Sequence, residues 1–173
     1  MENNPTITSL HNLLDSDSSK FTSAEVQLKK KLPEWNNAAV SLKLKAVLHK
    51  YLDLTQQHLE KLESFFEEEK EINSLSVNNR IMEAFVDETD EKLQNCADTG
   101  VKDACLLACV QAINHFKIST YGTAAAFAKV LGMEKAAALF HEIEVDEKQI
   151  DDRLSQLAKF EINAQAIVPL VRS

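Results

Sequence analysis

The stretch VKDACLLACVQAINHFKISTYGTAAAFAKVL, residues 101–131, decides the fold of this chain. Its first half is apolar almost all round, with seven consecutive apolar residues at 104–110. A helix that is apolar on every side lies at the centre of its domain. Gly132 follows directly, at the position where a helix commonly stops. We therefore predict a long, central helix over residues 101–131, preceded by a turn at residues 98–100.

Glycine and proline are scarce along the whole chain. Only 3 Gly and 3 Pro occur in 173 residues, and the glycines are too far apart for a dinucleotide-binding or P-loop motif. Turns, bulges and tight loops depend on these residues. The composition therefore disfavours sandwiches, barrels, Rossmann sheets and P-loop NTPases, and it indicates an all-α protein.

Helical spacing of apolar residues continues on both sides of the central stretch. The expected helical segments cover residues 7–39 (interrupted around 15–22), 42–71, 77–96 and 134–160, with a frayed start at 1–6 and a loose tail after Ile162 that contains Pro169. Pro33 should kink the first segment or mark a turn, because proline removes a backbone donor. Helices of roughly 40–47 Å suit an antiparallel four-helix bundle. We predict one ferritin-like domain over residues 1–173, with its core at about 20–166 and one additional shorter helix.

The charge pattern limits the partners. The net charge is −8, and residues 51–100 carry 13 acidic and 4 basic groups. Such a segment repels nucleic-acid phosphates and anionic lipid. The longest apolar run is far below the roughly 20 residues of a bilayer span. We expect no nucleic acid and no membrane partner, although the acidic block at residues 60–71 offers a docking face for another protein.

Cysteine usage indicates the compartment. Cys96, Cys105 and Cys109 make an odd count, and the start of the chain shows no secretory signal pattern. These features favour a reducing cytoplasm. Cys105 and Cys109 lie four residues apart in an apolar segment, and we expect them to be small buried hydrophobes rather than a redox pair.

Inward carboxylates and histidines in a bundle call for a test of di-iron chemistry. That chemistry needs Glu-x-x-His on two helices, and none of the five histidines has a Glu three residues before it. No HExxH or G-x-S-x-G motif occurs either. Two partial sets remain: Glu147 with Asp151, and Glu25 among apolar neighbours. On spacing alone these three are expected to be surface acids.

Two residues of the central helix stand out. His115 lies in the most apolar helix, where we expect a hydrogen-bonded core histidine rather than a ligand. Lys117 lies close to the same core and would be costly to bury unless a carboxylate pairs with it.

Short motifs in a fixed order resemble the YciE/YciF-type ferritin-like family of bacterial stress proteins. They are Ala24-Glu25, Leu32-Pro33, Leu44-Lys45-Ala46, Thr55, His58, Leu62-Glu63, residues 82–88, residues 100–104, residues 111–118, Tyr121-Gly122-Thr123, Leu131-Gly132, Asp146-Glu147-Lys148 with Asp151 and Leu154, and Ile162-Asn163-Ala164. The resemblance covers about residues 20–166. It implies a ferritin-like bundle that is commonly dimeric, with a candidate dinuclear metal centre and no established reaction.

Matching the family's metal-type positions to this sequence implies a ligand set of Glu25, His58, Glu147 and Asp151. Other positions depart from the family pattern. Leu54, Asn114 and Lys117 stand where carboxylates are expected, and Tyr51 stands where a histidine is expected. We hypothesise that Lys117 takes the place of metal charge by pairing with Glu25 or Glu147.

Three functions are compatible with these features. The first is a cytoplasmic, non-catalytic bundle, associated with stress, that acts as a homodimer or through a protein partner and needs no cofactor. The second is a metal-dependent oxidoreductase, of di-iron or di-manganese type, with an unconventional ligand set that binds iron or another divalent metal. The third is a helical module that binds another protein or a small apolar ligand.

Overall fold

The computed structural model describes residues 6–73 and 75–167. Its elements in chain order are α1 (Leu10–Ser18), α2 (Phe21–Ala38), α3 (Leu42–Glu68), α4 (Arg80–Asn95), α5 (Thr99–Val130), α6 (Glu134–Leu157), a π-helix, η1 (Ala158–Ile162), and α7 (Asn163–Gln165). The described residues form no strand. The expectations for Pro169 and for most of the frayed start lie outside the described residues.

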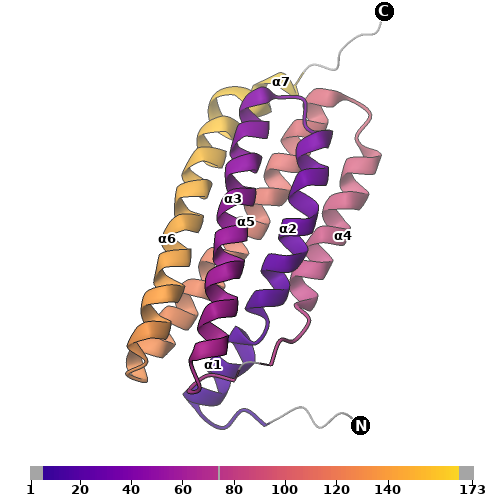
Figure 1. Ribbon diagram of the computed structural model, residues 1–173. Helices are drawn as coiled ribbons and strands as arrows, with labels where there is room; N and C mark the ends of the chain where they lie inside the picture. The colour runs from indigo at the N-terminus through magenta and orange to yellow at the C-terminus, as the bar shows by residue number, and fades with distance from the viewer. Residues whose placement is uncertain (1–5, 74, 168–173) are drawn as a thin grey trace, which may run out of the picture.

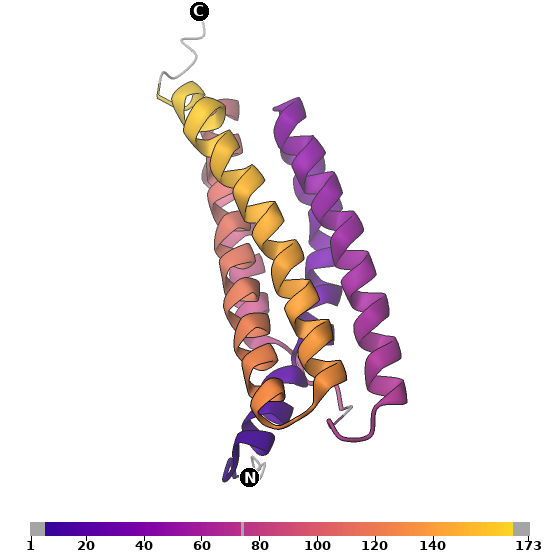
Figure 2. The same cartoon turned by 90° about the vertical axis from the view of Figure 1, so that its left-hand side faces the viewer.

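Five helices run side by side along one axis (Figures 1 and 2). The α2–α3 and α5–α6 pairs form two antiparallel hairpins, and the shorter α4 packs against α2 and α5. The short α1 lies at one end of the bundle and α7 at the other (Figure 1). The prediction of a ferritin-like four-helix bundle with one additional helix is confirmed.

At the starts of α1, α3, α4 and α5, polar side chains cap free backbone donors. Ser41 accepts from the Leu44 N–H, and Asp98 accepts from the N–H groups of Gly100 and Val101. The expected turn at residues 98–100 is therefore wrong, because Asp98 is an N-cap and α5 already begins at Thr99. At the other end of α5, Gly132 adopts φ 72°, as predicted for a helix stop.

Two other expectations need correction. Pro33 lies inside α2, which continues to Ala38, so it does not mark a turn. The missing N–H is tolerated because Leu32 and Trp35 on either side are buried and hold the helix in place. The predicted loose tail is also wrong for its first residues, because Ile162 is buried and α7 follows it over Asn163–Gln165. The tail beyond residue 167 lies outside the described residues. The predicted break in the first segment is confirmed, since α1 ends at Ser18 and α2 begins at Phe21.

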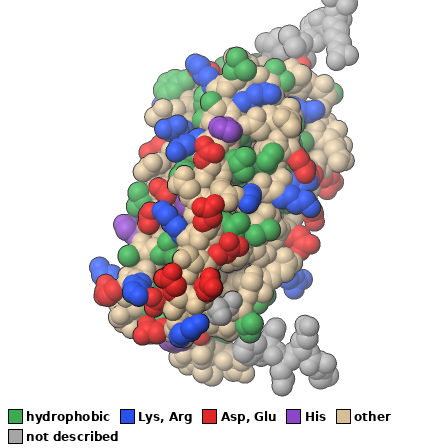
Figure 3. All heavy atoms as spheres, viewed as in Figure 1, with side chains coloured by type: hydrophobic (Ala, Val, Ile, Leu, Met, Phe, Trp, Pro, Cys, Tyr) green, Lys and Arg blue, Asp and Glu red, His purple; other side chains and the backbone are tan. Residues whose placement is uncertain are grey.

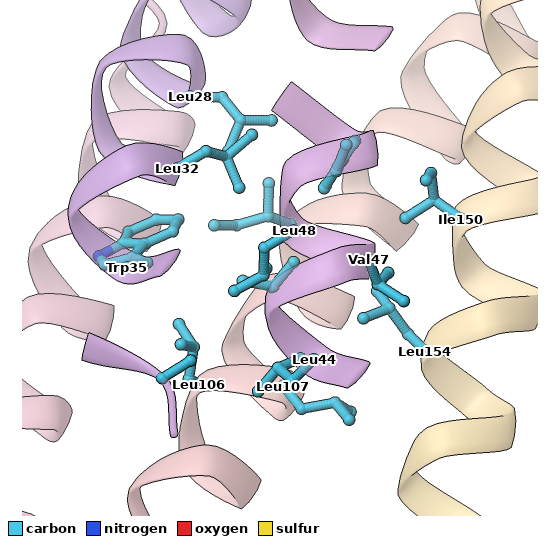
Figure 4. Close-up of a cluster of buried hydrophobic side chains, with 14 of the residues drawn as sticks. Leu28, Leu32, Trp35, Leu44, Val47, Leu48, Leu106, Leu107, Ile150 and Leu154 are labelled. Carbon is cyan, nitrogen blue, oxygen red and sulfur yellow. The ribbon is translucent and has the colours of Figure 1, made fainter. Parts of the chain in front are cut away.

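The interior consists of two apolar clusters stacked along the bundle. Figure 4 shows part of the larger one, where Leu28, Leu48 and Ile150 from three helices converge. The smaller cluster, around Tyr121 and Phe140, fills the region nearer α1. All three cysteines are free and half-buried, so the expectation that the two in α5 are buried is wrong. No described helix combines the length with the apolar composition that a bilayer span requires.

Candidate functional site

A layer of polar side chains lies between the two apolar clusters. Each of the four long helices contributes to it at the position where its buried stripe passes from one cluster to the other. On α2, for example, Glu25 follows Phe21 of one cluster and precedes Leu28 of the other. The members of this polar layer are Glu25 of α2, Tyr51 and His58 of α3, Asn114, Lys117 and Tyr121 of α5, and Glu147 of α6.

Lys117 is the centre of the polar layer. Its Nζ lies 2.9 Å from Oε2 of Glu25 and also pairs with Oε1 of Glu147. All three side chains are at most 1% exposed. Burial on its own lowers the pKa of Lys117, but the charges of Glu147 and Glu25 outweigh it and raise that pKa above the usual value. The lysine is therefore an ammonium ion held between two carboxylates.

Two tyrosines and one amide satisfy the remaining carboxylate oxygens. Tyr121 donates to Oε1 of Glu25 at 2.7 Å, and Tyr51 donates to Oε2 of Glu147 at 2.5 Å. Burial and the nearby carboxylates raise the pKa of both tyrosines well above the usual value, so both remain neutral donors. Asn114 donates through Nδ2 to Oε2 of Glu147 at 2.7 Å and to its backbone carbonyl at 2.9 Å.

His58 lies at the edge of the polar layer. Its Nε2 lies 3.0 Å from Oδ2 of Asp146, and because a carboxylate only accepts, Nε2 carries the proton. Nδ1 is then a lone-pair acceptor. It lies 3.6 Å from Oε1 of Glu147 and has no hydrogen-bond partner. Burial, followed by the charge of Lys117, lowers the pKa of His58, so the neutral ring is favoured.

The structure brings together three of the four ligands implied by the family resemblance. Glu25, His58 and Glu147 all contribute to the polar layer, so the expectation that these glutamates are surface acids is wrong. Asp151 does not join them. It lies one turn beyond Glu147, near the surface, where it pairs with Nε2 of His115 at 2.7 Å. His115 is 60% exposed, which corrects its expected place in the core.

These side chains do not fit a dinuclear metal centre. The ammonium of Lys117 lies between the two glutamates, where it would repel a bound cation. Leu54 is buried and offers no ligand atom. Within residues 6–73 and 75–167, no group of three or more His, Cys, Asp or Glu side chains is arranged to hold a metal ion.

The sequence analysis did not identify two residues of this site: Tyr121 of the polar layer and Asp146, the partner of His58. Tyr121 lies one helical turn after Lys117, a spacing that places both side chains on one face and could have indicated its role. Asp146 precedes Glu147 and lies at the edge of the inward face of α6, within reach of His58. The signal there is weaker, since neighbouring helix residues point in different directions.

Comparison with known proteins agrees with this architecture. A family described as a domain of unknown function (DUF892) matches residues 9–167. The chain belongs to the DUF892 family. Protein YciF of Escherichia coli strain K12 is 33% identical over 144 residues, which are 83% of this chain and 87% of that protein. The resemblance to YciF-type proteins is thereby confirmed.

Two solved structures resemble this DUF892 protein over nearly their whole length. The E. coli stress protein YciF has a TM-score of 0.84 at 30% identity, covering 91% of this chain and 99% of that one. YcfI, described as a putative structural protein from Rhodopseudomonas palustris, has a TM-score of 0.82 at 28% identity, covering 90% and 97%.

Proposed function

We propose that this chain is a non-catalytic ferritin-like bundle in which Lys117 supplies the positive charge that metal ions supply in di-iron bundles. The observation that carries the proposal is the Lys117 ammonium between Glu25 and Glu147. A stress-associated structural role in the cytoplasm fits the descriptions of the two relatives, a stress protein and a putative structural protein.

The charges explain why a lysine can occupy this position. Two carboxylates in a dry layer need nearby positive charge, because each is costly to bury alone. The two carboxylates alone carry a charge of −2, and the ammonium between them brings the sum to −1. The hydrogen bonds from Tyr51, Tyr121 and Asn114 stabilise the remaining charge. An ammonium ion can neither change its oxidation state nor bind a substrate as a metal ion does. We therefore expect this arrangement to stabilise the fold and not to catalyse a reaction.

Metal retention by the purified protein tests the proposal. After incubation with Fe(II), Mn(II) or Zn(II) and desalting, we expect elemental analysis to find no stoichiometric metal. Lys117→Glu, which replaces the ammonium with a carboxylate, is the matched variant and should retain more metal than the parent. Two metal ions per parent chain, or a visible absorption band on aerobic Fe(II) addition, would instead support the oxidoreductase alternative.

We infer that the protein acts through the outer surface of the bundle and not through the polar layer. We expect a homodimer, checked by light scattering on the eluting protein, and a monomer at micromolar concentration would contradict it. One acid of the block at residues 60–71 is already paired, because Lys135 pairs with Glu69 across the groove between α3 and α6. Lys61, which lies within the block, pairs with Glu142 of α6. Figure 3 shows acidic and basic side chains intermixed on this face.

A further inference from the structure

A groove lies at the end of the bundle that carries α1, away from the polar layer (Figure 1). It is formed where the segment between α3 and α4 meets the junction of α1 and α2, and its volume is about 750 Å³. Four apolar side chains that line it are 47–70% exposed: Ile7, Leu75, Val77 and Ile81. Exposed apolar side chains that share one concave surface are typical of a binding site.

Hydrogen bonds hold the walls of the groove together. The Val77 N–H donates to the Ser19 carbonyl at 2.8 Å. The Asn73 N–H donates to Oδ1 of Asp15 at 3.1 Å. The segment that follows α3 is thereby attached to the α1–α2 junction, so the groove is a feature of the protein on its own.

Two cations that line the groove have no direct partner. Neither Lys20 nor Arg80 makes a side-chain hydrogen bond or an ion pair with any residue that the structure describes, although Asp17 lies within electrostatic range of Lys20. Asp15, the acid among the described lining residues, accepts from a backbone N–H and lies 3.2 Å from Nδ1 of His11. The charges left for a ligand are therefore positive, although the whole chain carries a net charge of −8.

Two helices begin at the groove. Arg80 is the first residue of α4, and Lys20 is the N-cap of α2, whose start has no side-chain cap. The N-terminus of a helix carries partial positive charge and favours an anion. The backbone therefore adds to the positive charge of the two side chains. A ligand that uses the whole groove needs both a hydrocarbon part and an anionic group.

We propose that this groove binds a medium-chain carboxylate, a single hydrocarbon chain that ends in a carboxylate group. The hydrocarbon lies against Ile7, Val77 and Ile81, and the carboxylate pairs with Arg80 and Lys20. A guanidinium can donate two parallel hydrogen bonds to one carboxylate, which fixes the direction of the ligand. The groove shares no residue with the polar layer, so this proposal stands or falls separately from the proposed function.

Isothermal titration calorimetry of the full chain tests the proposal. The ligands are octanoate, decanoate and dodecanoate, each below its micelle-forming concentration. We expect one ligand per chain, with an affinity that rises by up to about fourfold per added methylene. Neutral 1-octanol should bind at least about fivefold more weakly than octanoate, because it cannot pair with the cations. Amide resonances of isotope-labelled protein should shift at residues 15–20 and 75–81.

Charge variants test the two cations. Lys20→Gln/Arg80→Gln should weaken octanoate binding at least about fivefold and bring its affinity close to that of 1-octanol. Lys50→Gln/Arg153→Gln is the matched control, because it removes the same two residue types outside the groove. It should leave the affinity unchanged, and circular dichroism checks that both variants are folded.

An apolar variant tests the hydrocarbon contact. Ile81→Ser should weaken binding of all the carboxylates, whereas Leu42→Ser, which changes an exposed residue outside the groove, should not. The proposal is overturned by an absence of saturable binding, by equal affinities for octanoate and 1-octanol, or by equal losses in the variants and their controls. Amide shifts that avoid the groove would also overturn it. The parent protein alone gives the chain-length series and the shifts, so the test stands even if one variant fails to fold.

Discussion

Two contacts between a basic and an acidic side chain join α5 to α6, and they differ most in their burial. Lys117 pairs with Glu147 inside the polar layer, where both side chains are at most 1% exposed. His115 pairs with Asp151 at the surface, with exposed fractions of 60% and 26%. Water can replace either partner in the second pair but not in the first. Burial, rather than residue type or spacing, therefore decides which pair the fold depends on.

Removal of the central ammonium should have the largest effect. Lys117→Met leaves Glu25 and Glu147 as buried carboxylates without a cation, and breaking such a pair costs about 3–5 kcal/mol. We expect the free energy of unfolding in urea at neutral pH to fall by that amount. The triple variant Glu25→Gln/Lys117→Met/Glu147→Gln removes every charge and should recover most of the loss. A loss below about 1 kcal/mol for Lys117→Met alone would show that the layer admits water.

Loss of one hydroxyl donor should have an intermediate effect. Tyr121→Phe removes the hydrogen bond to Glu25, and Tyr51→Phe removes the bond to Glu147. Hydrogen bonds to charged groups contribute about 1.5–3 kcal/mol, so each change should lower the urea-unfolding free energy by about that amount. In a Glu25→Gln background the loss from Tyr121→Phe should shrink while that from Tyr51→Phe persists. Equal losses in both backgrounds would contradict the assigned partners.

Acid should weaken the fold through the buried His58. The pKa of His58 is lowered in the fold, so below its unfolded value of about 6.5 the unfolded chain binds a proton that the folded chain does not. Stability then falls as pH decreases through this window, by up to about 1.4 kcal/mol per pH unit. Urea titrations between pH 7.5 and 5.5 measure the slope. His58→Gln should flatten it, and an unchanged slope in this variant would contradict the assignment to His58.

The sequence predicted the helices better than it predicted the faces they bury. Periodicity places α3 and α6 well, because their apolar residues form one stripe. The apolar first half of α5 has no such stripe, so the inward face cannot be identified there. His115 and Lys117 are two residues apart, roughly 200° around the helix, and only one can face the core. Apolar character favoured the histidine, whereas the structure buries the lysine.

Only part of the candidate site could be predicted from the sequence. Lys117 needs a carboxylate when buried, and the family resemblance indicated Glu25 or Glu147 as that partner. The same resemblance implied Asp151 as a ligand. The buried stripe of α6 instead passes through Ile150 and Leu154, which leaves Asp151 at the edge.

Loss of the surface contact between His115 and Asp151 should have the smallest effect on the free energy of unfolding. His115→Ala and Asp151→Ala each remove the exposed contact, and exposed pairs of this kind contribute only about 0–1 kcal/mol. Asp151 also accepts from Gln111 at 2.7 Å, so Asp151→Ala should cost slightly more than His115→Ala. The same urea titration measures both. A loss comparable to that of Lys117→Met would mean that the surface contact holds α5 to α6, and burial would then no longer explain the difference between the two pairs.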